Sequence, residues 1–226
     1  RAVSKLGSVR ARTGMYPVVI ENLQAASLLS IFGSAISGPQ VIRGMSFLRD
    51  RLKQQIFPGD IQIIDDPHIK RGHASRLFDG EGVTCKPTNF VEDGVLTQWA
   101  TNAESAAQLN HPLTGHGTPL GGGVGFSNLY MKSGNRSVEA IINDIDYGIF
   151  VTDFLGNGAN SLTGQISQAV SGFIIENGEI SRPFKEATIA GSVLEMFRHV
   201  VPANDLAMRG PVNAPTTRFE GLTVSG

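Results

Sequence analysis

The sequence predicts an α+β fold that is mainly antiparallel and hairpin-rich, with several short helices. Segments of helical pattern are interspersed with hairpins and do not alternate with single strands, which argues against a parallel α/β sheet. The 27 glycines and the low aromatic content of 7% are typical of a chain with many turns. Two segments, 90–96 and 174–180, each place a glycine between apolar runs, and Gly94 and Gly178 can supply the positive φ of a tight hairpin turn.

The first part of the chain should contain a strand followed by a long helix. Pro17–Ile20 is expected to be a short strand, and Asn22 can cap a helix over Leu23–Ile36. The apolar residues that share one face of this helix are Leu28, Leu29, Phe32 and Ile36. Gly38 and the proline after it should end the helix, since a proline has no backbone N–H to donate.

The remaining elements are predicted from similar local patterns. Ser46–Ile56 is expected to be a second, shorter helix, and Asp60–Asp65 a strand with a continuous apolar centre. Thr101–Glu104 has the spacing of a capping box and should open a helix that runs to about Leu109. Further helices are expected to open at Ser137 and at Ser192, and further strands at Tyr147–Leu155 and Phe219–Val224.

Composition and charge exclude several classes of protein. With 226 residues, of which 41% are hydrophobic and 17% charged, the chain can bury a sizeable core and is not disordered. A net charge of −1 argues against nucleic-acid binding, and no apolar run is long enough to span a bilayer. The single cysteine, Cys85, excludes a disulfide within the chain, so a reducing compartment such as the cytoplasm is expected.

The pattern along the chain predicts one domain. Residues 1–12 carry charges without the apolar core of a signal peptide, and they read like the end of a helix that begins elsewhere. We therefore expect residues 1–12 to be the tail of a preceding domain or a linker. Residues 13–226 contain no internal linker and are predicted to be a single domain.

The segment IIDDPHIKRGH, residues 63–73, raises the question of a metal site. Asp65 and Asp66 end a predicted strand, where neighbouring side chains point to opposite faces, so they cannot both bind one ion without a bulge. His68 and His73 are five residues apart, which matches no common zinc spacing. The favoured interpretation is turn residues that cap backbone N–H groups.

Other polar motifs are equally open to a structural interpretation. His111 and His116 bracket a short loop without an adjacent acidic or cysteine partner, so they are expected to be loop histidines in solvent. Gly121–Gly125 lacks the lysine of a phosphate-binding loop, and Cys85 is most simply a strand residue. No catalytic constellation follows from the residues alone.

Several motifs appear in a characteristic order along the chain. They are Gly44-x-Ser46-Phe47-Leu48, Ile64-Asp65-Asp66-Pro67, Phe78-Asp79-Gly80-Glu81-Gly82, Glu92-Asp93-Gly94-Val95-Leu96, Phe173-x-Ile175-Glu176-Asn177-Gly178-Glu179-Ile180, Glu186-Ala187-Thr188-Ile189-Ala190-Gly191 and Gly221-Leu222-Thr223-Val224-Ser225-Gly226. In this order they resemble the C-terminal domain of the TldD/PmbA family, and specifically its PmbA (TldE) branch. The resemblance covers almost the whole chain after Thr13.

The resemblance implies a cytoplasmic metalloprotease built from two related subunits and associated with peptide maturation. The TldD subunit carries a His-Glu-x-x-x-His motif on a helix and a cysteine near the C-terminus, which together bind zinc. The motif positions in this chain are Ser30, Ile31 and Ala35, and the later segment Asn204–Met208 has no cysteine. We therefore expect no metal ligand, no cofactor and no catalytic residue here.

The resulting expectation is a non-metal-binding subunit that helps to bind and process peptides, with zinc supplied by a TldD-type partner. Alone, the protein should form a homodimer. We expect a loop that contains Gly121, Gly122, Gly123 and Asn128 to contact the peptide. The alternative function is a regulatory module that binds DNA gyrase or its inhibitor. A third possibility is a hydrolase that uses Asp65, Asp66, His68 and His73.

Overall fold

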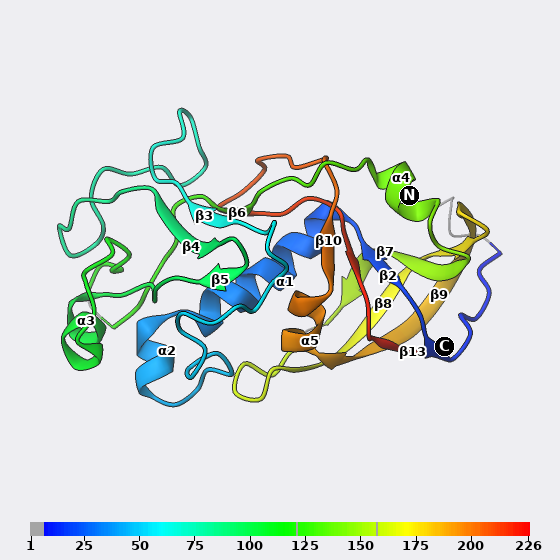
Figure 1. Ribbon diagram of the computed structural model, residues 1–226, viewed down its shortest axis with the longest axis horizontal. Coiled ribbons are helices and arrows are strands. Elements are labelled where there is room, and N and C mark those ends of the chain that lie inside the picture. Colours follow the sequence, from blue (N-terminus) through cyan, green and yellow to red (C-terminus); the bar gives the residue numbers. More distant parts are fainter. Residues whose placement is uncertain (1–6, 121, 157) are drawn as a thin grey trace.

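The protein is built from two β-sheets that share one long helix, as Figure 1 shows. The computed structural model describes residues 7–120, 122–156 and 158–226. The larger sheet has the strand order β1-β13-β9-β8-β7-β2-β12-β10. Its strands are β1 (Gly14–Met15), β2 (Val18–Ile20), β7 (Tyr147–Leu155), β8 (Gln165–Glu176), β9 (Glu179–Ser192), β10 (Val200–Pro202), β12 (Thr217–Phe219) and β13 (Thr223–Ser225).

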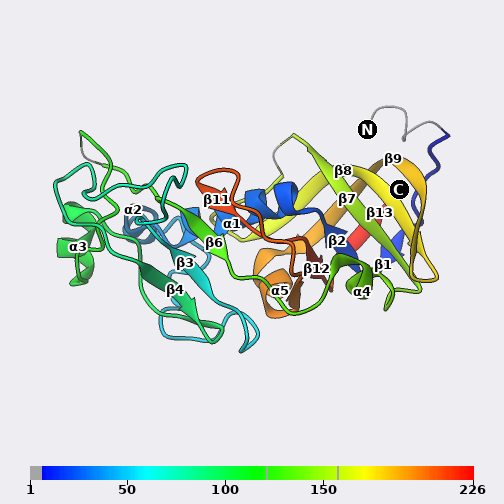
Figure 2. The same cartoon turned by 90° about the horizontal axis from the view of Figure 1, so that it is seen from above.

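The smaller sheet and its loops lie at the other end of the molecule (Figure 2). Its order is β11-β6-β3-β4-β5, with β3 (Ile63–Asp65), β4 (Thr88–Glu92), β5 (Val95–Leu96), β6 (Leu129–Met131) and β11 (Val212–Asn213). The helices are α1 (Asn22–Ala35), α2 (Gly38–Ile42), α3 (Ala103–Leu109), α4 (Val138–Ile142) and α5 (Val193–Arg198). None of the described helices combines the length and apolar character needed to cross a membrane.

The predicted α+β class is confirmed, and the pairing is mainly antiparallel. Two described strand pairs are parallel, β2 with β7 and β6 with β11. Strands from the two ends of the described chain meet in the larger sheet. Gly14 of β1 faces Val224 of β13, and Val18 of β2 faces Phe219 of β12.

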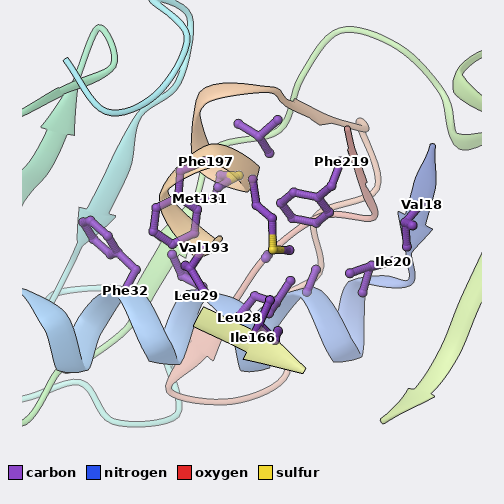
Figure 3. Packing of buried hydrophobic residues seen from close by; sticks show 14 of the residues in the cluster. Val18, Ile20, Leu28, Leu29, Phe32, Met131, Ile166, Val193, Phe197 and Phe219 are labelled. Atoms are coloured by element: carbon purple, nitrogen blue, oxygen red, sulfur yellow. The ribbon is translucent and has the colours of Figure 1, made fainter. Parts of the chain in front are cut away.

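Helix α1 supplies the centre of the main core. Leu28, Leu29 and Phe32 are at most 3% exposed, and Figure 3 shows them packed beneath Phe197 and Met131. Their spacing places them on one face of a helix, as the sequence predicts. The helix contacts β7 of the larger sheet and both β6 and β11 of the smaller one. The two sheets are therefore joined through the buried face of α1.

Three phenylalanines hold the centre of this core. The rings of Phe57 and Phe197 stack with centroids 4.6 Å apart, and Phe32 meets both rings edge-on at 5.8 and 6.0 Å. Offset stacking and edge-to-face contacts are the favourable arrangements of aromatic rings. The three rings come from α1, from α5 and from the irregular segment before β3, so their packing joins three parts of the chain that are distant in sequence.

Both predicted hairpins are present. In the first, Asp93 and Gly94 have φ values of 48° and 77°, and in the second, Asn177 and Gly178 have φ values of 53° and 79°. Two successive residues of positive φ are the signature of the turn that matches the twist of paired strands. The second hairpin is longer than its central motif indicates, because β8 and β9 pair from Gln165 to Ser192.

The predicted helix over Ser46–Ile56 is wrong. This segment is a series of turns in which Lys53 has a φ of 61°, and its backbone N–H donates to Leu96 O at 2.7 Å. Ile56 N–H likewise donates to Gly94 O at 2.9 Å. Hydrogen bonds to the β4–β5 hairpin thus replace the helical ones.

Several boundary predictions also need correction. Gly38 does not simply end a helix but begins α2, since a proline is tolerated in the first turn. Glu21, not Asn22, precedes α1, and Ser192 makes no side-chain cap for α5. The cap of α3 is Asn102 paired with Ser105, one residue later than predicted. The predicted strand Phe219–Val224 is two short strands, β12 and β13, separated by Gly221.

Gly94 offers a test of this architecture. A Cβ at Gly94 would lie 2.3 Å from Phe57 O and 2.4 Å from Pro58 O, whereas a Cβ at Gly82, which has a similar φ of 81°, would meet nothing within 4 Å. We predict that Gly82→Ala costs about 1–2 kcal/mol of unfolding free energy for the left-handed backbone. Gly94→Ala should cost roughly a further 1–3 kcal/mol for overpacking. Urea unfolding of both variants measures the difference, and equal losses would contradict the close approach.

Candidate functional site

Asp65 is a buried acid at the end of β3. Its carboxylate accepts from Ser127 N at 2.9 and 3.1 Å and lies 3.1 Å from Nε2 of His116. Both side chains of this pair are 2% exposed. Because burying a polar side chain costs free energy unless it is hydrogen-bonded, we infer that the Asp65–His116 pair is a structural requirement of the smaller sheet.

The rest of the 63–73 segment behaves as turn residues. Asp66 Oδ1 accepts from His68 N at 2.8 Å, which is a side-chain turn of the kind the sequence favours for this position. His68 and His73 are exposed and Asp65 is buried. Within the described residues, no group of three or more His, Cys, Asp or Glu side chains is placed to hold a metal ion.

The prediction of solvent histidines at 111 and 116 is wrong. His116 is buried between the rings of Phe90 and Phe126, with centroid distances of 5.2 and 5.6 Å, and its Nδ1 lies 3.0 Å from Thr114 Oγ1. His111 is half-buried, and its Nε2 accepts from Trp99 N at 3.3 Å. Burial lowers the pKa of His111, and the nearby Lys53 lowers it further.

Cys85 is not in a strand, contrary to prediction, but is buried in a loop with its thiol 3.2 Å from Gly115 O. Burial raises the pKa of Cys85, and Arg76 opposes this rise. The same loop is held by Asp79, whose carboxylate accepts from Glu81 N, Val83 N and Gly117 N. These contacts fix the loops around the smaller sheet and leave the thiol unsuited to nucleophilic chemistry.

A cavity of about 320 Å³ lies beside α1 where the helix faces the glycine-rich loop. Its lining consists of Ser30, Gly33, Ser34, Ser37, Pro39, Gln40, Arg43, Gly122, Gly123, Val124, Phe126, Leu129 and Val212. We call this space the α1 cavity. Its lining includes residues from two features that the sequence analysis treated separately. These are Ser30, at a predicted metal-motif position, and the glycine-rich loop.

Two of the predicted loop residues line the α1 cavity, and one does not. Gly122 and Gly123 are lining residues, whereas Gly121 lies outside the described residues. Asn128 is fully buried, and its side-chain amide donates to Asp66 O at 2.7 Å and to Ser75 Oγ at 2.9 Å. Asn128 therefore orders the loop after β3 and is not available to a peptide.

The three metal-motif positions of α1 face different surroundings. Ser30 is exposed, and its hydroxyl donates to Ala26 O at 3.1 Å. Ile31 packs against the main core, and Ala35 is fully buried in it. These side chains carry no group that zinc prefers, so the residues present do not fit the metal centre of the TldD type.

A second, smaller cavity continues along α1. It has a volume of about 190 Å³ and is lined by Leu23, Ala26, Arg209 and neighbouring residues, and it shares Val212 with the α1 cavity. The two cavities follow one accessible face of the helix, opposite the buried face of Leu28, Leu29 and Phe32. Around the α1 cavity this face carries the small residues Ser30, Gly33 and Ser34, so a ligand can approach the helix backbone closely there.

Residues 13–226 match the family model described as the PmbA/TldA metallopeptidase C-terminal domain. The chain belongs to the TldD/PmbA family. Metalloprotease PmbA of Escherichia coli O157:H7 is 34% identical over 227 residues, which is 100% of this chain and 49% of that protein.

Two solved structures share the fold over almost the whole chain. One, from Thermotoga maritima, has a TM-score of 0.92 at 32% identity and covers 99% of this chain and 53% of its own. The other, from Bacteroides thetaiotaomicron, has a TM-score of 0.90 at 29% identity, with 99% and 50% coverage. Each is described as a candidate modulator of DNA gyrase. The chain spans about half the length of the curated relatives that it matches.

The Asp65–His116 pair can be tested by truncation. Asp65→Ala leaves the buried Ser127 N–H and His116 ring without their acceptor, so it should cost about 3 kcal/mol of unfolding free energy. Asp66→Ala removes one partly exposed turn bond and should cost about 1 kcal/mol. Urea unfolding at neutral pH compares them. If both variants lost the same small amount, the buried pair would not be a structural requirement.

The environment of His111 predicts a pH effect on stability. Its pKa in the folded protein is lower than the ordinary value of 6.5, so the unfolded chain binds the proton more readily. The contribution of His111 is therefore complete above about pH 6.5 and is lost as the pH falls. Between pH 7.5 and 5.5, His111→Gln should lose less stability than the natural chain. The exposed His68→Gln is the matched control, and parallel losses in all three proteins would contradict the prediction.

Proposed function

We propose that the chain is a non-metal-binding subunit of a TldD/PmbA-type metalloprotease that helps to bind peptides while a TldD-type partner supplies the zinc chemistry. The observation that carries the proposal is the α1 cavity. It lies beside the helix on which the family's zinc motif would stand, yet the helix offers serine, isoleucine and alanine at the motif positions. A peptide-sized space without metal ligands suits binding and not hydrolysis.

The surroundings of the α1 cavity favour an extended peptide as its ligand. Val212, a lining residue, belongs to β11, which is the edge strand of the smaller sheet. An edge strand can receive an extended peptide through main-chain hydrogen bonds. Gly122 and Gly123 on the facing loop carry no side chains, which allows a peptide backbone to approach closely.

The proposal includes an assembly and a location. The resemblance to a two-subunit family supports a heterodimer with a metal-bearing subunit, in the cytoplasm. Without that partner, the protein would form a two-fold dimer, because related subunits offer similar surfaces. The chain's net charge of −1 supports peptides or unfolded proteins as substrates over nucleic acids.

A second function is supported by the descriptions of the two solved structures as candidate modulators of DNA gyrase. In that function the protein would bind the topoisomerase or its inhibitor and take no part in proteolysis. The two functions differ in one measurable respect. Only the first requires the α1 cavity for peptide turnover by a TldD-type subunit.

Blocking the α1 cavity tests the proposal. The full natural protein should carry no stoichiometric zinc and should show no peptide cleavage alone. Mixed with a TldD-type subunit, it should form a heterodimer on size-exclusion chromatography with light scattering and allow cleavage of an unstructured peptide. Ser34→Trp fills the cavity and should reduce cleavage about tenfold or more. Ser27→Trp, on the same helix but outside the cavity lining, should reduce it less than twofold.

Three outcomes would contradict the proposal. One zinc per chain after mild dialysis would point to a self-sufficient hydrolase. A protein that neither binds the TldD-type subunit nor changes its activity would favour the gyrase-related function. If the two tryptophan variants reduced cleavage equally, peptide turnover would not depend on the α1 cavity.

A further inference from the structure

The charge in the lining of the α1 cavity is positive. Among the lining residues that the structure describes, Arg43 is the only one with a charged side chain, and none carries a carboxylate. Arg43 is exposed and makes no ion pair with any carboxylate of the described chain. Arg49, six residues later, is instead paired with Asp50 at 3.2 Å. The cavity therefore presents an unpaired cation at its rim, which favours an anionic group.

Three serine hydroxyl groups belong to the lining of the α1 cavity. Ser30, Ser34 and Ser37 follow one another at helical spacing and all line the space. Ser37 precedes α2 without making a side-chain cap, and the Ser34 hydroxyl has no hydrogen-bond partner within the described part of the chain. Both hydroxyls are free to donate to a ligand oxygen.

Gln40 adds a buried acceptor that lacks a donor. Its Oε1 is shielded from solvent and has no hydrogen-bond partner among the described residues. Gln40 is a lining residue of the α1 cavity, but an oxygen that faced this open space would be accessible to solvent. Oε1 therefore points away from the space, and a ligand there meets other atoms of Gln40.

The lining also includes apolar side chains. Phe126, Leu129 and Val212 contribute hydrophobic side chains. Phe126 packs so closely on α1 that a Cβ at Gly33 would lie 2.9 Å from its ring. At about 320 Å³, the cavity is at the small end of the range for ligand sites and suits one or two residues.

We propose that the α1 cavity recognises the C-terminal residue of a peptide by its free α-carboxylate. Arg43, with Ser34 and Ser37, would bind the carboxylate. The apolar lining residues Phe126, Leu129 and Val212 would contact a hydrophobic side chain of the peptide. This inference rests on the proposed peptide-binding function and specifies which part of the peptide the subunit holds.

The experiment compares one fluorescent hexapeptide ending in leucine in two forms, the free acid and the C-terminal amide. Fluorescence anisotropy with the full natural protein should show the amide binding about tenfold more weakly, which corresponds to about 1.4 kcal/mol. Arg43→Gln should weaken the acid about tenfold and leave the amide unchanged, so that the two forms become equal. Arg43→Lys should retain part of the preference, and Arg49→Gln should leave both affinities within about twofold.

Two results would overturn the inference, and they differ in what they mean for the proposed function. If both peptides bind equally, and Ser34→Trp abolishes binding of both, carboxylate recognition fails while peptide binding in the α1 cavity stands. If neither peptide binds and the protein does not affect a TldD-type subunit, the proposed function fails as well. If inorganic phosphate displaces the acid peptide at a concentration equal to that of the peptide, the site is a general anion site, which would also overturn the inference.

Discussion

Burial of one face of α1 between two sheets is the interaction on which the rest of the structure depends. Leu28, Leu29 and Phe32 fill the space between strands of both sheets, and the stacked rings of Phe57 and Phe197 complete the contact. A helix that is apolar on one side only must leave its other side open. The small residues of that open side border the α1 cavity, so the packing that joins the sheets also places the site.

Sequence reasoning succeeded where local chemistry decides the structure. Asp93-Gly94 and Asn177-Gly178 select their turns directly, and the apolar spacing in α1 needs no distant partner to be recognised. It failed at Ser46–Ile56, because hydrogen bonds from Lys53 and Ile56 to the β4–β5 hairpin override the local helical preference. Those partners lie about forty residues away in the sequence, and no local pattern indicates them.

The site shows the same division. The prediction that Ser30, Ile31 and Ala35 stand at the family's metal-motif positions follows from the sequence once the family resemblance is seen. The Asp65–His116 pair is not, because the two residues are 51 positions apart and meet only after β3 and the loop before β6 are both in place. The sequence analysis also missed Arg43 and Gln40, since nothing in the sequence shows that they line the same cavity as the glycine-rich loop.

The position of β2 in the larger sheet determines when this strand can pair during synthesis of the chain. This strand leads directly into α1, yet its neighbours in the larger sheet are β7 and β12, which follow it by more than a hundred residues. Contacts between distant segments form slowly, because a long loop must close first. The apolar face of α1 is likewise buried in part by distant residues, since the ring of Phe32 packs against that of Phe197. Until Phe197 has been made, this face of the helix lacks one of its aromatic neighbours and leaves apolar surface exposed, which favours aggregation.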